Sequence, residues 1–571
     1  MSALPEGASY QKGRLHFASQ GVAELAARFD TPLYAYSEEV LEKSLFRFPL
    51  ARPGVTVCYA VKANSNLDIL ARLHGFGASF DIGSTEELRR VVTATQTTEV
   101  LKKCVATGPI KSVPFLKACL AYDVRINCIS SFNAAGCPLN TKATTRTSDG
   151  PEVTSAPLEQ FQVFSIHAES EGELARISSL RKSFPTSRTH IALRVNPDVA
   201  DDSVQHNVLA GPSSCTNFGV ATQEVLKLAN KYPIQGFHCH IGSGVLNEQV
   251  LYRARDAILR ILDQLDQAAE GSKIEYVDIG GALGVPQEDG QMPLDIPRVL
   301  DAIITPFINR GLKVFIEPGG SVVAQSGILL TRVEYTKSSS GRHFALVDAA
   351  VSDFVQPTLY GGYHRIVPEC EPFPAPAALP VSQHATKPVS TLHVNGQTVT
   401  SPGQPCSPQD FRTGSIDRKK AEGHRPDART ESLSAELRGS RESLDGLLTE
   451  MQGSRLFKKQ QAPPVPPTPS PRLCRRPSGE FATLPYDVVG PVCERQDVGL
   501  QRILPVLHEG DLLLVADVGA YGYAMASNYN SRCRPAQVMV LKTGEVKLIS
   551  RREMLEDQLM LERNLQSFEM T

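Results

Sequence analysis

The sequence predicts an α/β fold, a TIM-like (β/α)8 barrel, followed by a smaller all-β domain. Short apolar runs alternate with amphipathic stretches from about residue 32 to residue 318, and short β-like runs return between residue 484 and about residue 549. Alternating strands and helices are typical of a parallel sheet, and this length suits eight such units. The chain has 571 residues, too many for a single compact core, so more than one domain is expected.

Five apolar runs are predicted barrel strands, at residues 55–63, 190–195, 236–241, 274–279 and 314–317. The clearest predicted helix has apolar residues at i, i+3 and i+4 spacing, which places them on one face. These residues are Leu251, Ala254, Ile258, Ile261, Leu262 and Leu265.

The all-β domain, a β-sandwich or small β-barrel, is predicted from runs at residues 511–516, 537–541 and 545–549. We expect the N-terminal segment and residues 320–358 to complete it. The predicted boundaries are 1–33 for the N-terminal segment, 34–319 for the barrel, and 320–366 with 484–571 for the β domain.

Two insertions interrupt this pattern, at about residues 131–162 and 367–483. The first is rich in Thr, Ser, Pro and Asn, and the second has a charged tract and a proline-rich run at 463–467. Such compositions bury too little apolar surface to offset the entropy lost on ordering, so both are predicted to be disordered apart from a short helix at 431–451. The proline-rich run fits an SH3-type partner, but a simple linker is the favoured interpretation.

The composition argues against several classes of protein. A formal net charge of -2 gives no reason to expect binding to nucleic acid or to an anionic membrane. The twelve cysteines lack paired CxxC spacing, so neither a metal site nor a disulfide scaffold is expected. No signal peptide or membrane-spanning run is recognised, and we expect a cytoplasmic protein, with a plastid left open.

Lys62 lies at the carboxyl end of a predicted strand, where barrel enzymes place their reactive groups. Desolvation there is expected to lower the pKa of the lysine toward the free amine, which can attack an aldehyde. Taken alone, a strand-end lysine that reaches solvent is the simpler interpretation.

Three further strand ends carry polar or glycine-rich sequences. His238 and His240 precede a small-residue turn containing Ser243, which could present N–H groups and a hydroxyl to a phosphate. The DIGG element at 278–281 permits close backbone approach, and the EPG element at 317–319 supplies a carboxylate. Each signal is weak alone, but four such strand ends in one chain indicate an active site.

The YAVKAN, HxHIGSG, DIGG and EPG elements resemble, in this order, those of the fold-type III pyridoxal-phosphate decarboxylases, the ornithine, diaminopimelate and arginine decarboxylase group. This family has an alanine-racemase-like barrel. Residues 490–494 and 519–522 match it as well, and 525–530 with 534–536 are most similar to the diaminopimelate branch. The resemblance covers about residues 15–130, 163–366 and 484–550.

The resemblance implies pyridoxal 5'-phosphate as cofactor, held by Lys62 as a Schiff base. His240 is implied to stack on the ring, and Glu317 to keep its nitrogen protonated so that the ring accepts electrons. The implied cofactor-binding residues are Lys62, Asp81, Ser84, His240, Ser243, Gly280, Gly281, Glu317, Gly319 and Tyr521.

The resemblance implies that the substrate-binding part of the active site is shared between two subunits. Tyr360, Glu494 and Tyr521 are implied to bind an amino-acid substrate, and Cys493 to protonate the carbanion that CO2 leaves behind. Cys493 and Glu494 are implied to reach the active site of the opposite subunit in a head-to-tail homodimer.

The chain departs from the family at residues that bind substrate. Gly320 and Gln356 replace two arginines that serve the distal carboxylate of the substrate in diaminopimelate decarboxylases. A Gly–Gln pair cannot give bidentate recognition of a carboxylate, although Arg495 is a candidate to restore one charge. Asn217 and Ala282 replace a lysine and a glycine, and Arg495 itself replaces a serine.

The leading hypothesis is a carboxy-lyase that converts meso-2,6-diaminopimelate to L-lysine and CO2. The first alternative is a decarboxylase of a basic amino acid without a distal carboxylate, such as ornithine, arginine or lysine. The second is a catalytically silent, pyridoxal-phosphate-binding regulatory homologue. A racemase is less favoured, because residues 493–494 and 525–530 resemble the decarboxylase branch.

Overall fold

The computed structural model describes residues 4–121, 162–199, 217–268, 273–288, 290–371, 483–493 and 497–562. The predicted helix at 431–451, the proline-rich run and nearly all of both predicted insertions lie outside these residues. All the described residues belong to one compact unit.

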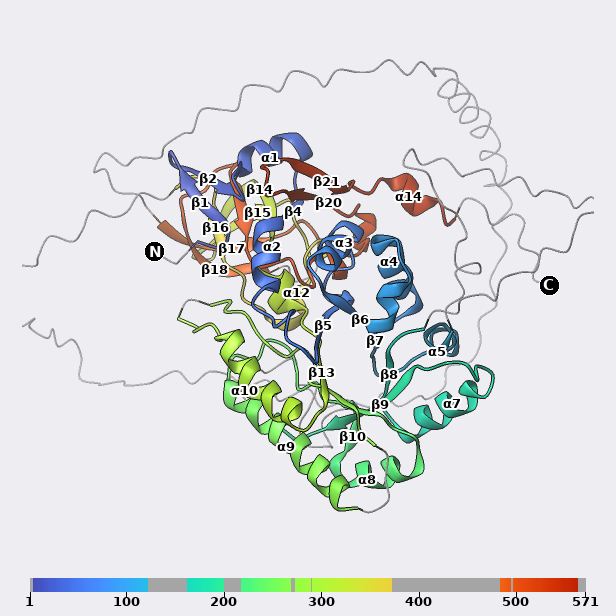
Figure 1. Cartoon of the computed structure of the whole chain (residues 1–571). Helices are drawn as coiled ribbons and strands as arrows, with labels where there is room; N and C mark the ends of the chain where they lie inside the picture. The colour runs from blue at the N-terminus through green and yellow to red at the C-terminus, as the bar shows by residue number, and fades with distance from the viewer. Residues whose placement is uncertain are drawn as a thin grey trace, which may run out of the picture. The chain divides into compact units, whose positions relative to one another are not determined.

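Eight parallel strands close into a barrel, which confirms the predicted fold (Figure 1). Strand β13 pairs with β5, and β8 pairs with β9, so the ring has no open edge. A short strand, β10 (Val220–Ala221), extends it beside β9. The eight are β5 (Val55–Ala60), β6 (Ser79–Ile82), β7 (Val105–Ala106), β8 (Ser165–Ala168), β9 (His190–Asn196), β11 (Gly236–His238), β12 (Tyr276–Asp278) and β13 (Lys313–Ile316).

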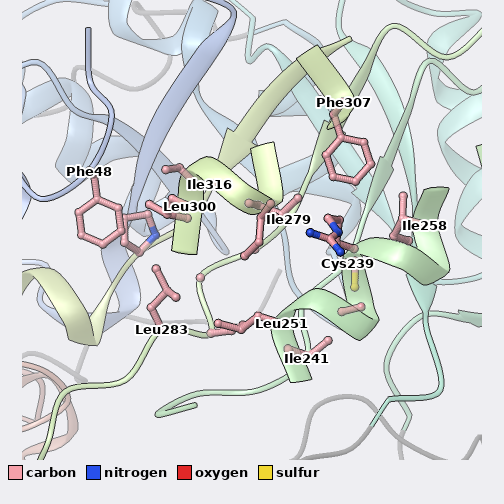
Figure 2. Close-up of a pocket in the computed structure, with 17 residues that line it drawn as sticks. Phe48, Cys239, Ile241, Leu251, Ile258, Ile279, Leu283, Leu300, Phe307 and Ile316 are labelled. Atoms are coloured by element: carbon pink, nitrogen blue, oxygen red, sulfur yellow. The ribbon is translucent and has the colours of Figure 1, made fainter. Parts of the chain in front are cut away.

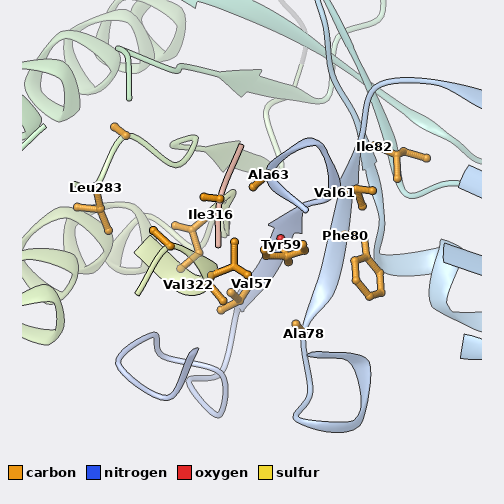
Figure 3. Packing of buried hydrophobic residues seen from close by; sticks show 14 of the residues in the cluster. Val57, Tyr59, Val61, Ala63, Ala78, Phe80, Ile82, Leu283, Ile316 and Val322 are labelled. Carbon is orange, nitrogen blue, oxygen red and sulfur yellow. The ribbon is translucent and has the colours of Figure 1, made fainter. Parts of the chain in front are cut away.

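Helices cover the outside of the barrel. Helix α9 (Glu248–Gln267) confirms the predicted amphipathic segment, and its six predicted apolar residues are all buried. The others are α3 (Leu67–Gly75), α4 (Thr85–Thr95), α5 (Val113–Leu120), α7 (Glu171–Arg181), α8 (Thr222–Lys231) and α10 (Ile296–Asn309). Figure 3 shows the apolar core around β5 and β6, to which Val57, Tyr59 and Phe80 contribute.

The barrel interior has two layers with different chemistry. The layer nearer the amino ends of the strands is an apolar cluster of Cys58, Val105, Ala192, Tyr276 and Phe315. The layer nearer the carboxyl ends, two residues further along several of the strands, consists of polar side chains. Because side chains two apart in a strand share a face, this second layer points into the same interior. Its members are Asp81, Thr107, His167, Arg194, His238, Asp278 and Glu317.

The β domain is built on a mixed sheet in the order β18-β17-β15-β14-β4-β20-β21, with β19 paired to β14 and β16 paired to β19. Strand β4 (Leu33–Ser37) precedes the barrel in sequence, yet it pairs with both β14 (Gly327–Ser339) and β20 (Ala536–Val540). The predicted β runs near the C-terminus are confirmed as β19 (Leu512–Val515), β20 and β21 (Val546–Ser550). The remaining strands are β15 (Arg342–Val347), β16 (Ile366–Pro368), β17 (Thr483–Val489) and β18 (Asp497–Pro505).

The smaller elements complete the described chain. Strands β1 (Ala8–Gln11), β2 (Arg14–Phe17) and β3 (Gln20–Gly21) form a separate sheet. The short helices are α1 (Val22–Phe29), α2 (Glu38–Leu45), α11 (Gly320–Val323), α12 (Gln356–Tyr360) and α14 (Leu555–Leu559). Among the described residues, no helix combines the length and apolar character that crossing a bilayer requires. The cytoplasmic location stays a prediction.

Candidate active site

Lys62 lies on a turn of 3-10 helix, Val61–Ala63, directly after β5. The predicted strand 55–63 is therefore wrong at its end, because the strand stops at Ala60. The β domain holds this turn in place: the backbone N–H of Tyr521 donates to the carbonyl of Ala63 at 2.8 Å. The side chain of Asn64 also donates to the carbonyl of Gly519 at 3.0 Å.

The ammonium group of Lys62 donates to Oδ2 of Asp81 at 2.8 Å. Asp81 is buried in the polar layer, and its Oδ1 accepts a hydrogen bond from the hydroxyl of Thr107. Burial lowers the pKa of Lys62, as expected, but the negative charge of Asp81 and the proximity of Tyr521 and Glu317 raise it by more. The expected lowered pKa is therefore wrong, because the inner face of the barrel supplies a counter-ion.

His240 and the glycine turn after β12 fit closely together. The backbone N–H of Gly281 donates to Nδ1 of His240 at 3.1 Å. A Cβ added to Gly280 would lie 2.6 Å from that nitrogen, and one added to Gly281 would lie 2.2 Å from the carbonyl oxygen of Glu317. Only glycine at both positions leaves His240 and the EPG segment where they are.

Glu317 follows β13 and reaches into a buried cluster with two histidines. Its Oε2 lies 3.2 Å from Nε2 of His238, and its Oε1 lies 3.7 Å from Nδ1 of His167. Nε2 of His167 lies 4.0 Å from Oδ2 of Asp278. Among the described residues, Oε1 of Glu317 has no hydrogen-bond partner.

A buried ion pair supports the strand end that carries His240. Arg194 pairs with Glu169 at 2.7 Å, and both side chains are almost fully buried. Arg194 also donates to the carbonyl of His240 at 3.4 Å and stacks on the ring of Phe218. Sequence reasoning missed Arg194, Glu169, His167 and Thr107. Of these four residues only Arg194 lies on a predicted strand, so no local signal in the sequence indicated a shared site.

These residues fit pyridoxal phosphate. A carboxylate oxygen without a partner suits a protonated pyridine nitrogen. The side chain of Lys62 is 49% exposed, so its amine is accessible to an aldehyde. The phenol of Tyr521 lies beside Gly319, 3.5 Å from where a Cβ on that glycine would be. Ser243 is half-buried on the turn after His240, whereas the hydroxyl of Ser84 caps α4 by accepting from the backbone N–H of Glu87 at 3.1 Å.

The structure describes only some of the predicted substrate-binding residues. Tyr360 is half-buried at the end of α12, and Gln356 begins that helix. Gly320 begins α11, and a Cβ added there would meet nothing within 4 Å. Cys493 is exposed on the segment after β17. Glu494 and Arg495 lie outside the described residues.

A cavity of about 30 Å³ lies between the ends of the barrel strands and helices α9 and α10 (Figure 2). It is lined by apolar side chains such as Ile279, Leu283 and Phe307. This volume holds about one water molecule, so the cavity cannot take an amino acid.

Comparison with known families gives two matches. Residues 39–134 and 155–324 match the pyridoxal-binding domain of pyridoxal-dependent decarboxylases, and residues 449–519 match the C-terminal sheet domain of the same enzymes. Diaminopimelate decarboxylase of Neisseria meningitidis serogroup B is 29% identical, with 94% of each chain covered. That of Aquifex aeolicus is 27% identical, with 95% of this chain and 94% of the relative covered.

Solved structures show the same fold. Diaminopimelate decarboxylase from Helicobacter pylori, complexed with L-lysine, has a TM-score of 0.63 at 23% identity and covers 95% of this chain and 99% of its own. Lysine decarboxylase from Selenomonas ruminantium has a TM-score of 0.57 at 16% identity, with 92% and 97% covered.

Proposed function

The chain belongs to the family of pyridoxal-dependent decarboxylases, and we propose that it converts meso-2,6-diaminopimelate to L-lysine and CO2. The substrate is proposed from the curated relatives named diaminopimelate decarboxylase, which match nearly the whole chain. The observation that carries the proposal is the convergence of Lys62, the glycine turn at 280–281 and a partly unpartnered Glu317 at the carboxyl ends of the barrel strands.

Each residue of this set is proposed to hold one part of the cofactor. Lys62 would hold the aldehyde group, Glu317 would accept a hydrogen bond from the ring nitrogen, and His240 would lie against the ring. Ser243 would present its hydroxyl to the phosphate together with Tyr521, and Gly280 and Gly281, whose N–H groups bind Asp278 and His240, would let the backbone approach it closely. Asp81, Ser84 and Gly319 complete the predicted cofactor set.

When bound, the cofactor supplies a protonated ring that accepts the electron pair left when CO2 departs. The residues on the substrate side would fix the orientation of the amino acid. It then delivers one proton to the α-carbon. We assign the proton to the thiol of Cys493.

The position of Cys493 favours a shared active site. Cys493 is exposed on the surface of its own subunit. In a homodimer, Cys493 and Glu494 of one subunit would complete the site of the other, with Glu494 binding the second amino group of the substrate. Tyr360 and Tyr521 then line the substrate side that each subunit provides itself.

A second candidate is decarboxylation of ornithine, arginine or lysine. Gly320 and Gln356 favour it, because neither supplies the positive charge that a distal carboxylate requires. A silent regulatory homologue is disfavoured by the nearly complete cofactor set.

The test is reconstitution with pyridoxal phosphate, followed by measurement of CO2 and product from meso-diaminopimelate, L-ornithine, L-arginine and L-lysine. Lysine formed from diaminopimelate by the wild type and not by Lys62→Ala supports the proposal. Faster release of CO2 from a basic amino acid supports the second candidate. Bound cofactor without turnover of any substrate supports the silent homologue.

A further inference from the structure

A buried amide connects the barrel to the β domain beside the active site. Asn64 follows the 3-10 turn that carries Lys62 (the Lys62 turn), and it is 2% exposed. Its side-chain N–H groups donate to the carbonyl of Gly519 at 3.0 Å and to the hydroxyl of Tyr36 at 3.1 Å. Its side-chain oxygen accepts from the backbone N–H of Asn66 at 3.1 Å. The proposed function gives Asn64 no role.

These partners allow only one orientation of the amide. The backbone N–H of Asn66 can only donate, so it faces the amide oxygen, and the carbonyl of Gly519 can only accept, so it faces the amide nitrogen. Tyr36 accepts from Asn64 and donates to Oε1 of Gln537 at 3.1 Å. Asn64, Tyr36 and Gln537 are each at most 2% exposed, so water does not readily replace a bond that is lost here.

The turn at residues 519–522 (the tyrosine turn) is held by contacts from outside it. Tyr521 has a φ of 55°, in the left-handed region that is unfavourable for a bulky side chain. Its backbone N–H donates to the carbonyl of Ala63 in the Lys62 turn at 2.8 Å, and the carbonyl of Gly519 accepts from Asn64. These two hydrogen bonds join the Lys62 turn to the tyrosine turn, and the second of them comes from a side chain that a substitution can remove.

The two turns meet at Gly319. A Cβ on Gly319 would lie 3.2 Å from the Cβ atoms of Ala60 and Ala63, and 3.5 Å from the phenol oxygen of Tyr521. The phenol is also close enough to Lys62 for each group to shift the pKa of the other. The amine and the phenol therefore face the same space, and their separation depends on how the two turns are held.

We propose that Asn64 is a positioning residue that holds the Lys62 turn and the tyrosine turn at a fixed separation, so that one cofactor molecule is held by its aldehyde and its phosphate at once. The inference rests on the proposed function only in giving Lys62 to the aldehyde and Tyr521 to the phosphate. A site that holds two ends of a ligand binds it more tightly when the two holding groups are already in place. Asn64 acts through these groups, because its own side chain is occupied by Gly519, Tyr36 and Asn66.

The test compares pyridoxal 5'-phosphate with pyridoxal, which lacks the phosphate, by absorbance titration without substrate. The dissociation constant of pyridoxal divided by that of pyridoxal 5'-phosphate (the phosphate ratio) measures what the phosphate contributes to binding. Asn64→Ala should lower the phosphate ratio about tenfold, because Tyr521 is no longer held in place relative to Lys62. A substitution that only destabilises the fold weakens binding of both ligands alike and leaves the ratio unchanged.

Tyr521→Phe and the double variant Asn64→Ala/Tyr521→Phe complete a double-mutant cycle. Tyr521→Phe should lower the phosphate ratio as well. The double variant should lower it little further, because without the phenol the position of the tyrosine turn matters less to the phosphate. An unchanged ratio in Asn64→Ala, or losses that multiply in the double variant, would overturn the proposal.

Asn66→Ala is the matched control. The side chain of Asn66 also reaches the β domain, where it donates to the carbonyl of Ile549 at 3.3 Å, and it caps α3 by accepting from the backbone N–H of Asp68 at 2.9 Å. Both partners lie outside the tyrosine turn. We therefore expect Asn66→Ala to lower stability and leave the phosphate ratio unchanged. A fall as large as that of Asn64→Ala would overturn the proposal, because any weakened contact with the β domain would then have the same effect.

Tyr36→Phe covers a failure of Asn64→Ala to fold. It keeps the ring and removes only the hydroxyl between Asn64 and Gln537, so the phosphate ratio should fall about threefold, and an unchanged ratio overturns the proposal. A wild type that binds both ligands equally would also overturn it. Because no substrate is present, a wild type that prefers the phosphorylated ligand but forms no lysine would refute the proposed substrate and not the role of Asn64.

Discussion

Lys62 donates a 2.8 Å hydrogen bond to Asp81, a carboxylate 1% exposed on the neighbouring strand of the barrel. Strands β5 and β6 place Ala60 opposite Asp81, so the turn that follows β5 brings the lysine over this carboxylate. The lysine side chain is 49% exposed while its counter-ion is buried. The pair therefore holds the lysine protonated, and it must give up that proton before its nitrogen can attack an aldehyde.

Asp81→Asn should speed attachment of the cofactor at neutral pH. Without the charge of Asp81 the pKa of Lys62 falls, so more free amine is present. We expect attachment about tenfold faster at pH 7, with the pH midpoint of the rate moved to lower pH. Stopped-flow absorbance after mixing with pyridoxal phosphate measures both. Asp301→Asn is the control, since Asp301 is exposed in a surface ion pair with Arg52; an unchanged midpoint in Asp81→Asn would contradict the argument.

Gly281→Ala should damage the glycine turn. A Cβ at this position would lie 2.2 Å from the backbone oxygen of Glu317, so β13 or the turn must move. Overpacking of this kind costs about 1–3 kcal/mol of unfolding free energy, and cofactor affinity should fall with it. Urea denaturation and cofactor titration measure the two effects. Gly320→Ala adds the same methyl group into open space, and its unfolding free energy should stay within about 0.5 kcal/mol of the wild type.

The barrel could be predicted from sequence because its strands are short apolar runs between amphipathic helices. The polar layer could not be recognised from the same runs. His167 and Arg194 lie within short buried strands, where a polar core residue with an internal partner is the usual interpretation. Their common layer depends on which strands neighbour one another around the ring, which no local pattern encodes.

The strand pairing of the β domain could not be predicted from sequence either, because the paired strands lie far apart in the chain. Its strands near the C-terminus were predicted from apolar runs, but the central place of β4 was not. Leu33 pairs with Leu330 on one side and with Ala536 on the other, partners roughly three hundred and five hundred residues away. Pairing at such separation leaves no local signal in either strand. Lys62 itself was recognised from its motif, although its strand was predicted to run to residue 63.

Restoring the two family arginines should reveal the substrate. Gly320→Arg is sterically possible, since a Cβ there meets nothing within 4 Å. If diaminopimelate is the substrate, the double variant Gly320→Arg/Gln356→Arg gains charge-assisted hydrogen bonds to its distal carboxylate. Such bonds contribute about 1.5–3 kcal/mol each, so KM should fall at least about tenfold. Activity toward L-ornithine should not improve. Steady-state kinetics of the double variant and the wild type on both substrates measure these changes. A KM for diaminopimelate that does not fall would indicate that other groups already bind the carboxylate.

His364 should make the stability of the β domain depend on pH below neutrality. Its Nδ1–H donates to the carbonyl of Ala516 at 3.0 Å, and its ring packs edge-on against Phe354. Burial lowers the pKa of His364 from 6.5 to about 4. The unfolded chain therefore binds more protons than the folded chain between about pH 6.5 and pH 4, and stability is lost as the pH falls through this window. The full loss is about 3 kcal/mol, from 1.4 kcal/mol for each unit of difference in pKa.

His364→Asn keeps an N–H for Ala516 but has no proton to bind. Its unfolding free energy in urea should therefore depend less steeply on pH across this window than that of the wild type. Equal slopes for the two proteins would show that other groups, such as Asp517 with its raised pKa, govern the acid range.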